Sequence, residues 1–244
     1  MHQAAFRDLG IAAEYTAVHV KEDQLADWVK QFCLQGGNGF SVTIPHKQAI
    51  LQYLDEIDPL AARIGAVNAV LYDEGVLSGF NTDGLGFVQG INQFQLEREV
   101  NVLMIGAGGA ARGIYYALLE AGYNNIVMAN RTVEKAKEMT DHAISIQEAE
   151  EQLGDFQLVI QTTSVGMIDN ELPLQLNKLR SETVVCDIIY NPLKTKFLEV
   201  AEQKGAVIQN GLEMFARQGA CAFEIWTGQA PNIELMKKAV LGDF

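Results

Sequence analysis

Hydrophobic side chains in the leading part of the chain follow two different spacings. In residues 23–34 they recur at three- and four-residue steps, as on one face of a helix, whereas residues 15–20 and 40–44 carry strand-type side chains. Proline at a first turn predicts a helix over residues 45–54 and a shorter one from residue 58. Residues 67–72 and 76–80 predict a hairpin, because turn-forming residues separate them. This part of the chain is therefore expected to be α/β.

From residue 100 onward the pattern changes to short, uninterrupted apolar runs separated by helix-length segments. The runs occupy residues 100–105, 126–129, 156–162, 184–188 and 206–208. Buried apolar strands that alternate with helices, such as one over residues 114–121, predict a doubly wound parallel sheet. Residues 211–243 are helical in pattern and add no strand. We expect two α/β domains: residues 83–210 form a Rossmann domain, and residues 1–82 with 211–244 form the other.

Composition limits the classes of function. The chain has 244 residues, of which 48% are hydrophobic and 20% charged, and it has no apolar run of the ~20 residues that a membrane span needs. Its start does not resemble a signal peptide. The formal charge of −13 argues against nonspecific binding to nucleic acid, which requires many cations. The 3 cysteines have no metal-binding spacing and suit a reducing compartment.

These limits predict a soluble, cytoplasmic protein. We expect it to bind no metal, no nucleic acid and no membrane. The sequence leaves the oligomeric state open, a homodimer being one option.

A glycine-rich turn follows the first strand of the second pattern. Glycine allows a tight turn and a close approach of the backbone to a pyrophosphate, and the free N–H groups of the next helix bind the anion. The glycine-rich turn lies between a predicted strand and a predicted helix, and this position favours dinucleotide binding over a merely structural turn. The predicted cofactor-binding residues are Gly106, Ala107, Gly108, Gly109 and Ala110.

The end of the next strand predicts which dinucleotide binds. NAD sites usually place Asp or Glu ~20 residues on, to hold the ribose 2′-hydroxyl. Here the strand ends in Asn130, Arg131 and Thr132, and Lys135 follows. A guanidinium can hold phosphate oxygens bidentately, and the neutral side chains can add hydrogen bonds. We expect NADP rather than NAD; the alternative is that Arg131 and Lys135 lie on a solvated helix start.

Three polar side chains stand at the ends of separate predicted elements. Lys47 ends the run Gly-Phe-Ser-Val-Thr-Ile-Pro-His-Lys, Asn68 ends Gly-Ala-Val-Asn, and Asp83 lies in Asn-Thr-Asp-Gly. Taken singly, such residues are more often surface lysines, turns or helix caps. Their joint occurrence, in this order and before a nucleotide fingerprint, indicates a small-molecule site.

Together with the fingerprint and residues 210–214, these runs resemble the shikimate dehydrogenase family over essentially the whole chain. The resemblance implies an α/β substrate-binding domain and an NADP-binding Rossmann domain. It implies an enzyme of aromatic amino acid biosynthesis that reversibly reduces 3-dehydroshikimate to shikimate, with Lys47 and Asp83 as its catalytic pair. Such a reduction needs a hydride donor and a proton for the oxygen, and an ammonium beside a carboxylate can deliver the proton.

The resemblance also implies which other side chains contact the ligands. The substrate hydroxyls or ketone would be bound by Thr43, Asn68, Asp83, Tyr190 and Gln218. The nicotinamide side of the cofactor would be lined by Ile188, Gly211 and Met214. Two alternatives stay open: a quinate/shikimate dehydrogenase that accepts quinate and uses NAD, and a noncatalytic NADP-binding module.

The likeness begins late in the family's pattern. Members of the family carry a further amino-terminal segment, with a strand and a Ser-x-Ser pair that binds the substrate carboxylate, and this chain opens beyond it at Met1. We expect either that Met1 is an internal methionine of a longer product or that this form binds NADP and turns over poorly.

Overall fold

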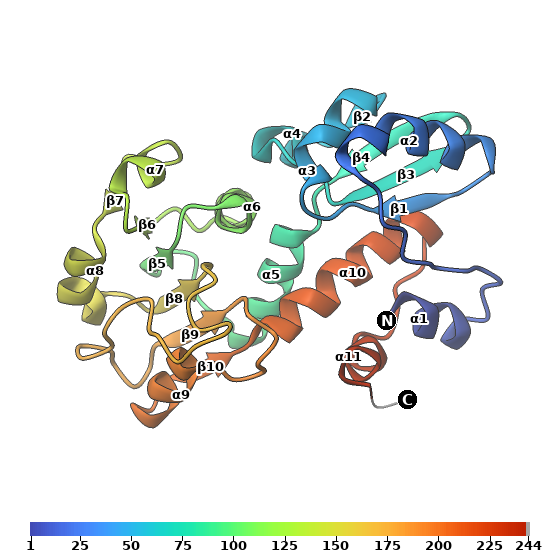
Figure 1. Ribbon diagram of the computed structural model, residues 1–244. Helices are drawn as coiled ribbons and strands as arrows, with labels where there is room; N and C mark the ends of the chain where they lie inside the picture. Colours follow the sequence, from blue (N-terminus) through green and yellow to red (C-terminus); the bar gives the residue numbers. More distant parts are fainter. Residues whose placement is uncertain (243–244) are drawn as a thin grey trace. The chain divides into compact units, whose positions relative to one another are not determined.

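The computed structural model describes residues 1–242, and the contacts within it divide the chain into two compact units. The first unit comprises residues 1–86 and the chain from Ala216 onward, and the second comprises Phe87–Phe215. Each unit has its own sheet. In Figure 1 the strands of the first unit are blue to cyan, and the strands of the second unit are green to orange. The helices α5 (Asp83–Ile91) and α10 (Gly211–Thr227) each begin in one unit and end in the other. The expected α/β fold with two domains is confirmed.

The second unit contains a six-stranded sheet with the strand order β10-β9-β8-β5-β6-β7, and every neighbouring pair is parallel. The strands are β5 (Val102–Ile105), β6 (Ile126–Ala129), β7 (Ala143–Ile144), β8 (Leu158–Gln161), β9 (Val184–Asp187) and β10 (Val207–Gln209). The predicted doubly wound sheet is thus confirmed. Strand order reverses between β5 and β8, and ligands of such sheets bind beside the carboxyl ends of the strands at that point.

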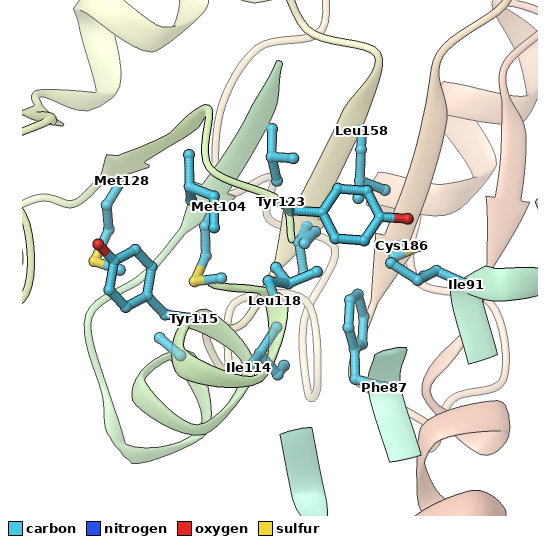
Figure 2. Packing of buried hydrophobic residues seen from close by; sticks show 14 of the residues in the cluster. Phe87, Ile91, Met104, Ile114, Tyr115, Leu118, Tyr123, Met128, Leu158 and Cys186 are labelled. Carbon is cyan, nitrogen blue, oxygen red and sulfur yellow. The ribbon is translucent and has the colours of Figure 1, made fainter. Parts of the chain in front are cut away.

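Helices cover both faces of this sheet. They are α6 (Gly109–Glu120), α7 (Val133–Lys137), α8 (Ile146–Gln152) and α9 (Lys196–Gln203), with short 3-10 turns at Asn92–Phe94 and Leu153–Asp155. Side chains alternate along each strand, so Met104 packs with α5 and α6 while its neighbour Leu103 packs with α8 and α9. Figure 2 shows the first of these cores, which includes Met104, Ile114 and Leu118, with Phe87 and Ile91 of α5 on the side of Cys186.

The first unit contains a four-stranded sheet with the order β1-β3-β4-β2. The strands are β1 (Gly39–Ser41), β2 (Glu56–Ile57), β3 (Ala69–Asp73) and β4 (Val76–Phe80). Antiparallel pairing of β3 with β4 confirms the predicted hairpin. The two-residue strand β2, parallel to β4, was not expected, because two residues give no hydrophobic period.

Helices of the first unit come from both ends of the chain. They are α1 (His2–Asp8), α2 (Leu25–Leu34) after a 3-10 turn at Glu22–Gln24, α3 (His46–Ala49) continued by a 3-10 turn at Ile50–Tyr53, α4 (Pro59–Ile64) and α11 (Ile233–Leu241). Phe6, Phe223 and Met236 form a small core that joins α1, α10 and α11. The helical stretch expected at the carboxyl end comprises α10 and α11; its last predicted residue, Asp243, lies outside the described residues.

One predicted strand is wrong. Residues 15–20 are extended but belong to no strand, and the strand expected over residues 40–44 ends at Ser41. Side chains hold the extended segment instead: the Tyr15 hydroxyl donates to Ser41 Oγ (2.8 Å), and His46 Nε2 donates to the Val20 carbonyl (2.7 Å). A groove of about 660 Å³ is lined by both this segment and β1. Strand-type residues suit any half-buried extended backbone, so their presence does not establish a ladder.

None of the helices in residues 1–242 combines the length and the apolar character that crossing a bilayer demands.

Candidate active site

Lys47 and Asp83 meet although 36 positions separate them along the chain. Lys47 Nζ donates to Asp83 Oδ2 across 2.6 Å. The β3–β4 hairpin explains this proximity. Asn68 directly precedes β3 and Asp83 shortly follows β4, so antiparallel pairing brings both to the same end of the sheet. The Val67 N–H donates to the Lys47 carbonyl (2.8 Å), which fixes α3 at that end as well.

Asn68 orients the carboxylate. Its Nδ2 donates to Asp83 Oδ1 (2.8 Å), so each oxygen of the carboxylate has a donor. Asn68 is only 5% exposed, and its Oδ1 accepts the Thr82 N–H (2.8 Å), which sets which way the amide faces. With one oxygen held by a neutral amide, the other is directed at the ammonium.

Two further residues support this arrangement and were not predicted. Thr82 is fully buried, and its hydroxyl oxygen accepts from Asn68 Nδ2 (3.0 Å). Asn81 Oδ1 accepts the Asp83 N–H (3.2 Å), and its Nδ2 donates to the Ala66 carbonyl (2.9 Å). The run Asn-Thr-Asp-Gly signals a cap or a turn, and Asn81 performs such a local role toward the Asp83 N–H. The contacts of Thr82 with Asn68 and of Asn81 with Ala66 reach distant parts of the chain, which the run does not signal.

Gln218 joins the group from α10. Its Oε1 lies 3.4 Å from Asn68 Nδ2. Gly86 of α5 makes the approach of the two helices feasible, because a Cβ there would lie 2.4 Å from the Gln218 backbone nitrogen. The first unit therefore brings Lys47, Asn68, Asp83 and Gln218 into one hydrogen-bonded cluster.

Solvent reaches the cluster, as the Lys47 and Asp83 side chains are 30% and 19% exposed. Thr43 lies in the loop before α3, where its hydroxyl donates to the Ile44 carbonyl (3.3 Å), and it stands apart from these hydrogen bonds.

The glycine-rich turn lies between β5 and α6, at the point where strand order reverses. Gly106 has φ 112, and a Cβ there would lie 2.5 Å from Thr162 Oγ1, so only glycine fits. Added Cβ atoms at Gly108 and Gly109 would meet nothing within 4 Å, so the start of α6 faces open space. The first N–H groups of α6 have no acceptor within the helix. A narrow turn beside an open helix start fits the pyrophosphate of a dinucleotide.

Residues that follow β6 fit a ribose phosphate. Arg131 and Lys135 are both exposed, and within residues 1–242 neither forms an ion pair. Asn130 Nδ2 donates to the Thr132 carbonyl (2.8 Å), which shapes the loop, and the Thr132 side chain makes no capping bond to α7. β6 ends in Ala129, so no carboxylate occupies the strand end where NAD sites have one.

Four predicted residues lie together at the end of β9 and the start of α10. Gly211 donates its N–H to the Ile189 carbonyl (2.9 Å), and a Cβ on it would lie only 2.0 Å from the Ile188 oxygen. The Tyr190 ring stacks on Phe215 at 4.5 Å. Ile188 and Met214 both pack against the core of Figure 2. All of them belong to the second unit.

Side chains at the ends of β8 and β9 were not predicted. Gln161 is fully buried, and its Oε1 accepts the Thr163 N–H (2.7 Å). Asp187 is 2% exposed, and burial raises its pKa to about 6, opposed by hydrogen bonds from the Ile189 N–H and the Thr195 hydroxyl. The position of both at carboxyl ends of strands, next to the fingerprint, was the signal that could have identified them.

Among residues 1–242 no group of three or more His, Cys, Asp or Glu side chains is placed to hold a metal ion.

Comparison with known proteins bears directly on this geometry. The family model described as shikimate/quinate 5-dehydrogenase matches residues 91–192. Models of the shikimate dehydrogenase substrate binding domain and of the shikimate 5′-dehydrogenase C-terminal domain match residues 1–70 and 211–241. A Bacillus cereus (strain AH820) protein named shikimate dehydrogenase (NADP(+)) is 49% identical over 99% of this chain and 91% of its own length.

The chain belongs to the shikimate dehydrogenase family.

Solved structures of the family agree. A shikimate dehydrogenase in complex with NADP+ has a TM-score of 0.91 at 38% identity, over 99% of this chain and 89% of that one. The enzyme from Thermus thermophilus, in complex with NADP(H) and shikimate, has a TM-score of 0.90 at 36% identity, over 100% and 93% of the two chains. The predicted family, the class of NADP-dependent oxidoreductases and the cofactor NADP are thereby confirmed.

Proposed function

We propose that this chain interconverts shikimate and 3-dehydroshikimate with NADP, and that Lys47 and Asp83 form its acid–base pair. The observation that carries the assignment of the pair is the 2.6 Å contact between Lys47 Nζ and Asp83 Oδ2, in a chain of this family. A lysine with no role beyond solubility would not be expected to face such a carboxylate. The second oxygen of Asp83 is held by the buried amide of Asn68, so the carboxylate is oriented toward Lys47.

The proton step follows from this geometry. When bound, NADPH supplies the hydride. As negative charge develops on the ketone oxygen, the Lys47 ammonium donates a proton to it, so an N–H bond breaks and an O–H bond forms. Asp83 stabilises the ammonium before the transfer, and solvent returns a proton to the amine afterwards. In the oxidative direction the neutral amine accepts the hydroxyl proton.

Substrate recognition is assigned to neutral polar groups around this pair. Asn68 and Gln218 are placed for it by their hydrogen bonds within the cluster, and Thr43 lies shortly before Lys47. Tyr190, from the second unit, is retained as a substrate contact on the strength of the family resemblance. Such groups discriminate hydroxylated rings well, because an unpaired buried partner is unfavourable.

NADP is assigned to the second unit. The turn from Gly106 to Ala110 fits the pyrophosphate, and Arg131 with Lys135, aided by Asn130 and Thr132, fits the 2′-phosphate. Ile188, Gly211 and Met214 would line the nicotinamide. A cytoplasmic location, and the absence of nucleic-acid and membrane partners, stay predictions from composition and charge; a homodimer stays an option.

The deciding experiment compares Lys47→Ala with the unaltered chain. Reduction of NADP+ by shikimate is followed at the nicotinamide absorbance band, and affinity for NADP+ is measured by calorimetry. We expect kcat to fall by about 10²–10⁴-fold while NADP+ affinity is retained. Lys30→Ala, at an exposed position of α2, is the matched control and should leave kcat unchanged.

Three outcomes would contradict the proposal. A fully active Lys47→Ala variant excludes the acid–base role. No turnover by the unaltered chain, with NADP+ bound, favours the noncatalytic module. Equal turnover of quinate with NAD favours the quinate/shikimate type.

A further inference from the structure

A single buried carboxylate holds both ends of the loop that carries Tyr190. Asp187 ends β9, and its Oδ1 accepts the Ile189 N–H (2.9 Å) at the start of the loop. Its Oδ2 accepts the Thr195 hydroxyl (2.7 Å) at the end of the loop. Thr195 is also the N-cap of α9, where its Oγ1 accepts the Leu198 N–H (3.4 Å). The loop over residues 188–195 is therefore closed by one side chain at its base.

The closed loop is continuous with the start of α10. Ile189, whose N–H is bound by Asp187, accepts the Gly211 N–H with its carbonyl (2.9 Å). Tyr190 stacks on Phe215, one turn into the same helix. A change in the loop is therefore transmitted to the residues assigned to the nicotinamide side, because backbone and rings are in direct contact.

The neighbouring strand end is built in the same way. Gln161 is in register with Asp187, and its side chain bonds the next loop through the Thr163 N–H (2.7 Å) and the Val165 carbonyl (2.9 Å). The two loops lie close together, since a Cβ added to Gly166 would lie 3.7 Å from the Thr195 Cβ. The loops that follow β8 and β9 are thus both fixed by hydrogen bonds from a buried polar side chain at the end of the strand.

A buried acid at this position is unfavourable in itself. Burial raises the pKa of Asp187 to about 6, and the two hydrogen bonds only partly offset the loss of water. An apolar residue would pack at the end of β9 without that loss. An apolar residue could not replace the two acceptor oxygens of Asp187, because one carboxylate accepts hydrogen bonds from a backbone N–H and from a hydroxyl at the same time.

We propose that Asp187 and Thr195 are positioning residues that set the placement of Ile188, Tyr190 and, through Gly211, Met214. The inference rests on the proposed function, because it concerns residues assigned there to the nicotinamide side and, for Tyr190, to the substrate. Removing the Thr195 hydroxyl leaves a buried carboxylate oxygen without its donor, and the loop moves to find water or another partner. Displacements of about 1 Å at a reacting centre can lower the rate about 100-fold.

The test compares Thr195→Val, which removes the hydroxyl at nearly constant shape, with Thr195→Ser, which keeps it. Shikimate-dependent NADP+ reduction gives kcat and KM. Calorimetry gives the affinities for NADP+ and for adenosine 2′,5′-bisphosphate, which lacks the nicotinamide. For Thr195→Val we expect kcat to fall up to about 100-fold and NADP+ affinity to fall, with unchanged affinity for the bisphosphate. Thr195→Ser should stay close to the unaltered chain in all three.

Ser145→Ala is the matched control for loss of a helix cap in the same unit. Ser145 caps α8, and its Oγ accepts the Glu148 N–H (3.2 Å), away from the loop. This variant should unfold at a lower temperature yet keep kcat and both affinities. If Thr195→Val behaves as Ser145→Ala does, Thr195 serves stability only and the proposal is overturned.

Two further results decide the remaining cases. Should Thr195→Val fail to fold, Asp187→Asn takes its place: it keeps an acceptor for the Ile189 N–H and offers an amide to Thr195, so kcat should be retained. A folded Asp187→Asn variant that loses kcat contradicts positioning by these hydrogen bonds. Should the unaltered chain not turn over shikimate, the proposed function fails, whereas the ratio of the NADP+ and bisphosphate affinities still tests the positioning role.

Discussion

At the scale of single residues, the side chains that would react are more exposed than the side chains that orient them. Lys47 and Asp83 are partly exposed, whereas Asn68 and Thr82, which fix the carboxylate, are buried. The cofactor region repeats this division, with Arg131 exposed and Asp187 buried. Substitution of an exposed member should therefore alter binding or rate without unfolding the protein.

Arg131→Ala tests the basis of cofactor choice. Hydrogen bonds to charged groups contribute about 1.5–3 kcal/mol, so loss of the guanidinium should weaken NADPH about 10–100-fold. NADH, without the 2′-phosphate, should bind almost as before. Fluorescence titration with both cofactors measures the difference, and Lys204→Ala, at an exposed position beyond α9, is the control. Equal losses for the two cofactors would mean that the phosphate binds elsewhere.

At the scale of elements, the approach of α5 to α10 depends on one missing side chain. Gly86 faces the Gln218 backbone, and no atom of a larger residue fits between them. The helix that begins with Asp83 and the helix that carries Gln218 are thereby held at a fixed separation. The position of Gln218, a predicted substrate-binding residue, therefore depends on the packing of the two helices as well as on its hydrogen bond with Asn68.

Gly86→Ala should push the two helices apart. Overpacking of a tight contact destabilises by about 1–3 kcal/mol, and we expect a lower unfolding temperature together with a raised KM for shikimate. Leu85→Ala changes a neighbouring residue of α5 that is 40% exposed, and should have little effect on either quantity. An unchanged KM in a measurably destabilised Gly86→Ala variant would show that Gln218 does not contact the substrate.

The elements also show what the sequence could and could not predict. Five of the six strands of the second unit were predicted from short apolar runs, which burial on both faces makes continuous in β5, β8 and β9. The β3–β4 hairpin was predicted because its turn residues are distinctive. The strands β2 and β7 were missed because two residues carry no period. Residues 15–20 carry strand-type side chains but form no strand, because side-chain preference does not reveal whether a neighbouring strand exists.

Site residues were predictable to the extent that motifs mark them. Lys47, Asn68 and Asp83 lie in distinctive runs, but their contact depends on hairpin pairing across the chain. Asp187 and Gln161 lie in apolar runs that carry no motif, and only their position at strand ends could have singled them out. Their shared role in holding loops becomes visible when parallel register places them side by side.

At the scale of the whole molecule, the two units have separate cores and can be observed separately. Both tryptophans, Trp28 and Trp226, belong to the first unit, so tryptophan fluorescence reports on that unit. His2 packs against Trp226 with ring centroids 5.2 Å apart, and its Nδ1 is buried without a partner in the described part of the chain. Burial, with a smaller contribution from the amino-terminal charge, lowers the pKa of His2 from 6.5 to about 4.

This lowered pKa predicts an acid-sensitive first unit. The unfolded chain takes up a proton on His2 below pH 6.5 and the folded unit only near pH 4, so stability is complete above pH 6.5 and is lost as the pH falls through that window. The loss is at most on the order of 3 kcal/mol. His2→Phe should lessen it, as measured by urea unfolding with tryptophan fluorescence at pH 7 and at about pH 4.5, inside that window. His19→Gln, at an exposed position, serves as control; equal pH dependence of the two variants would refute the assignment.

The hairpin that joins Asn68 to Asp83 has a consequence for how such enzymes diversify. The hydrogen bonds that link Lys47, Asn68 and Asp83 are made within the first unit, while the glycine turn and the Arg131 loop are encoded in the second. Mutations that retune recognition of the ring and mutations that exchange one nucleotide for another therefore fall in different stretches of the gene. Selection can therefore change the preference for the substrate ring without changing the preference for the nucleotide, and the reverse.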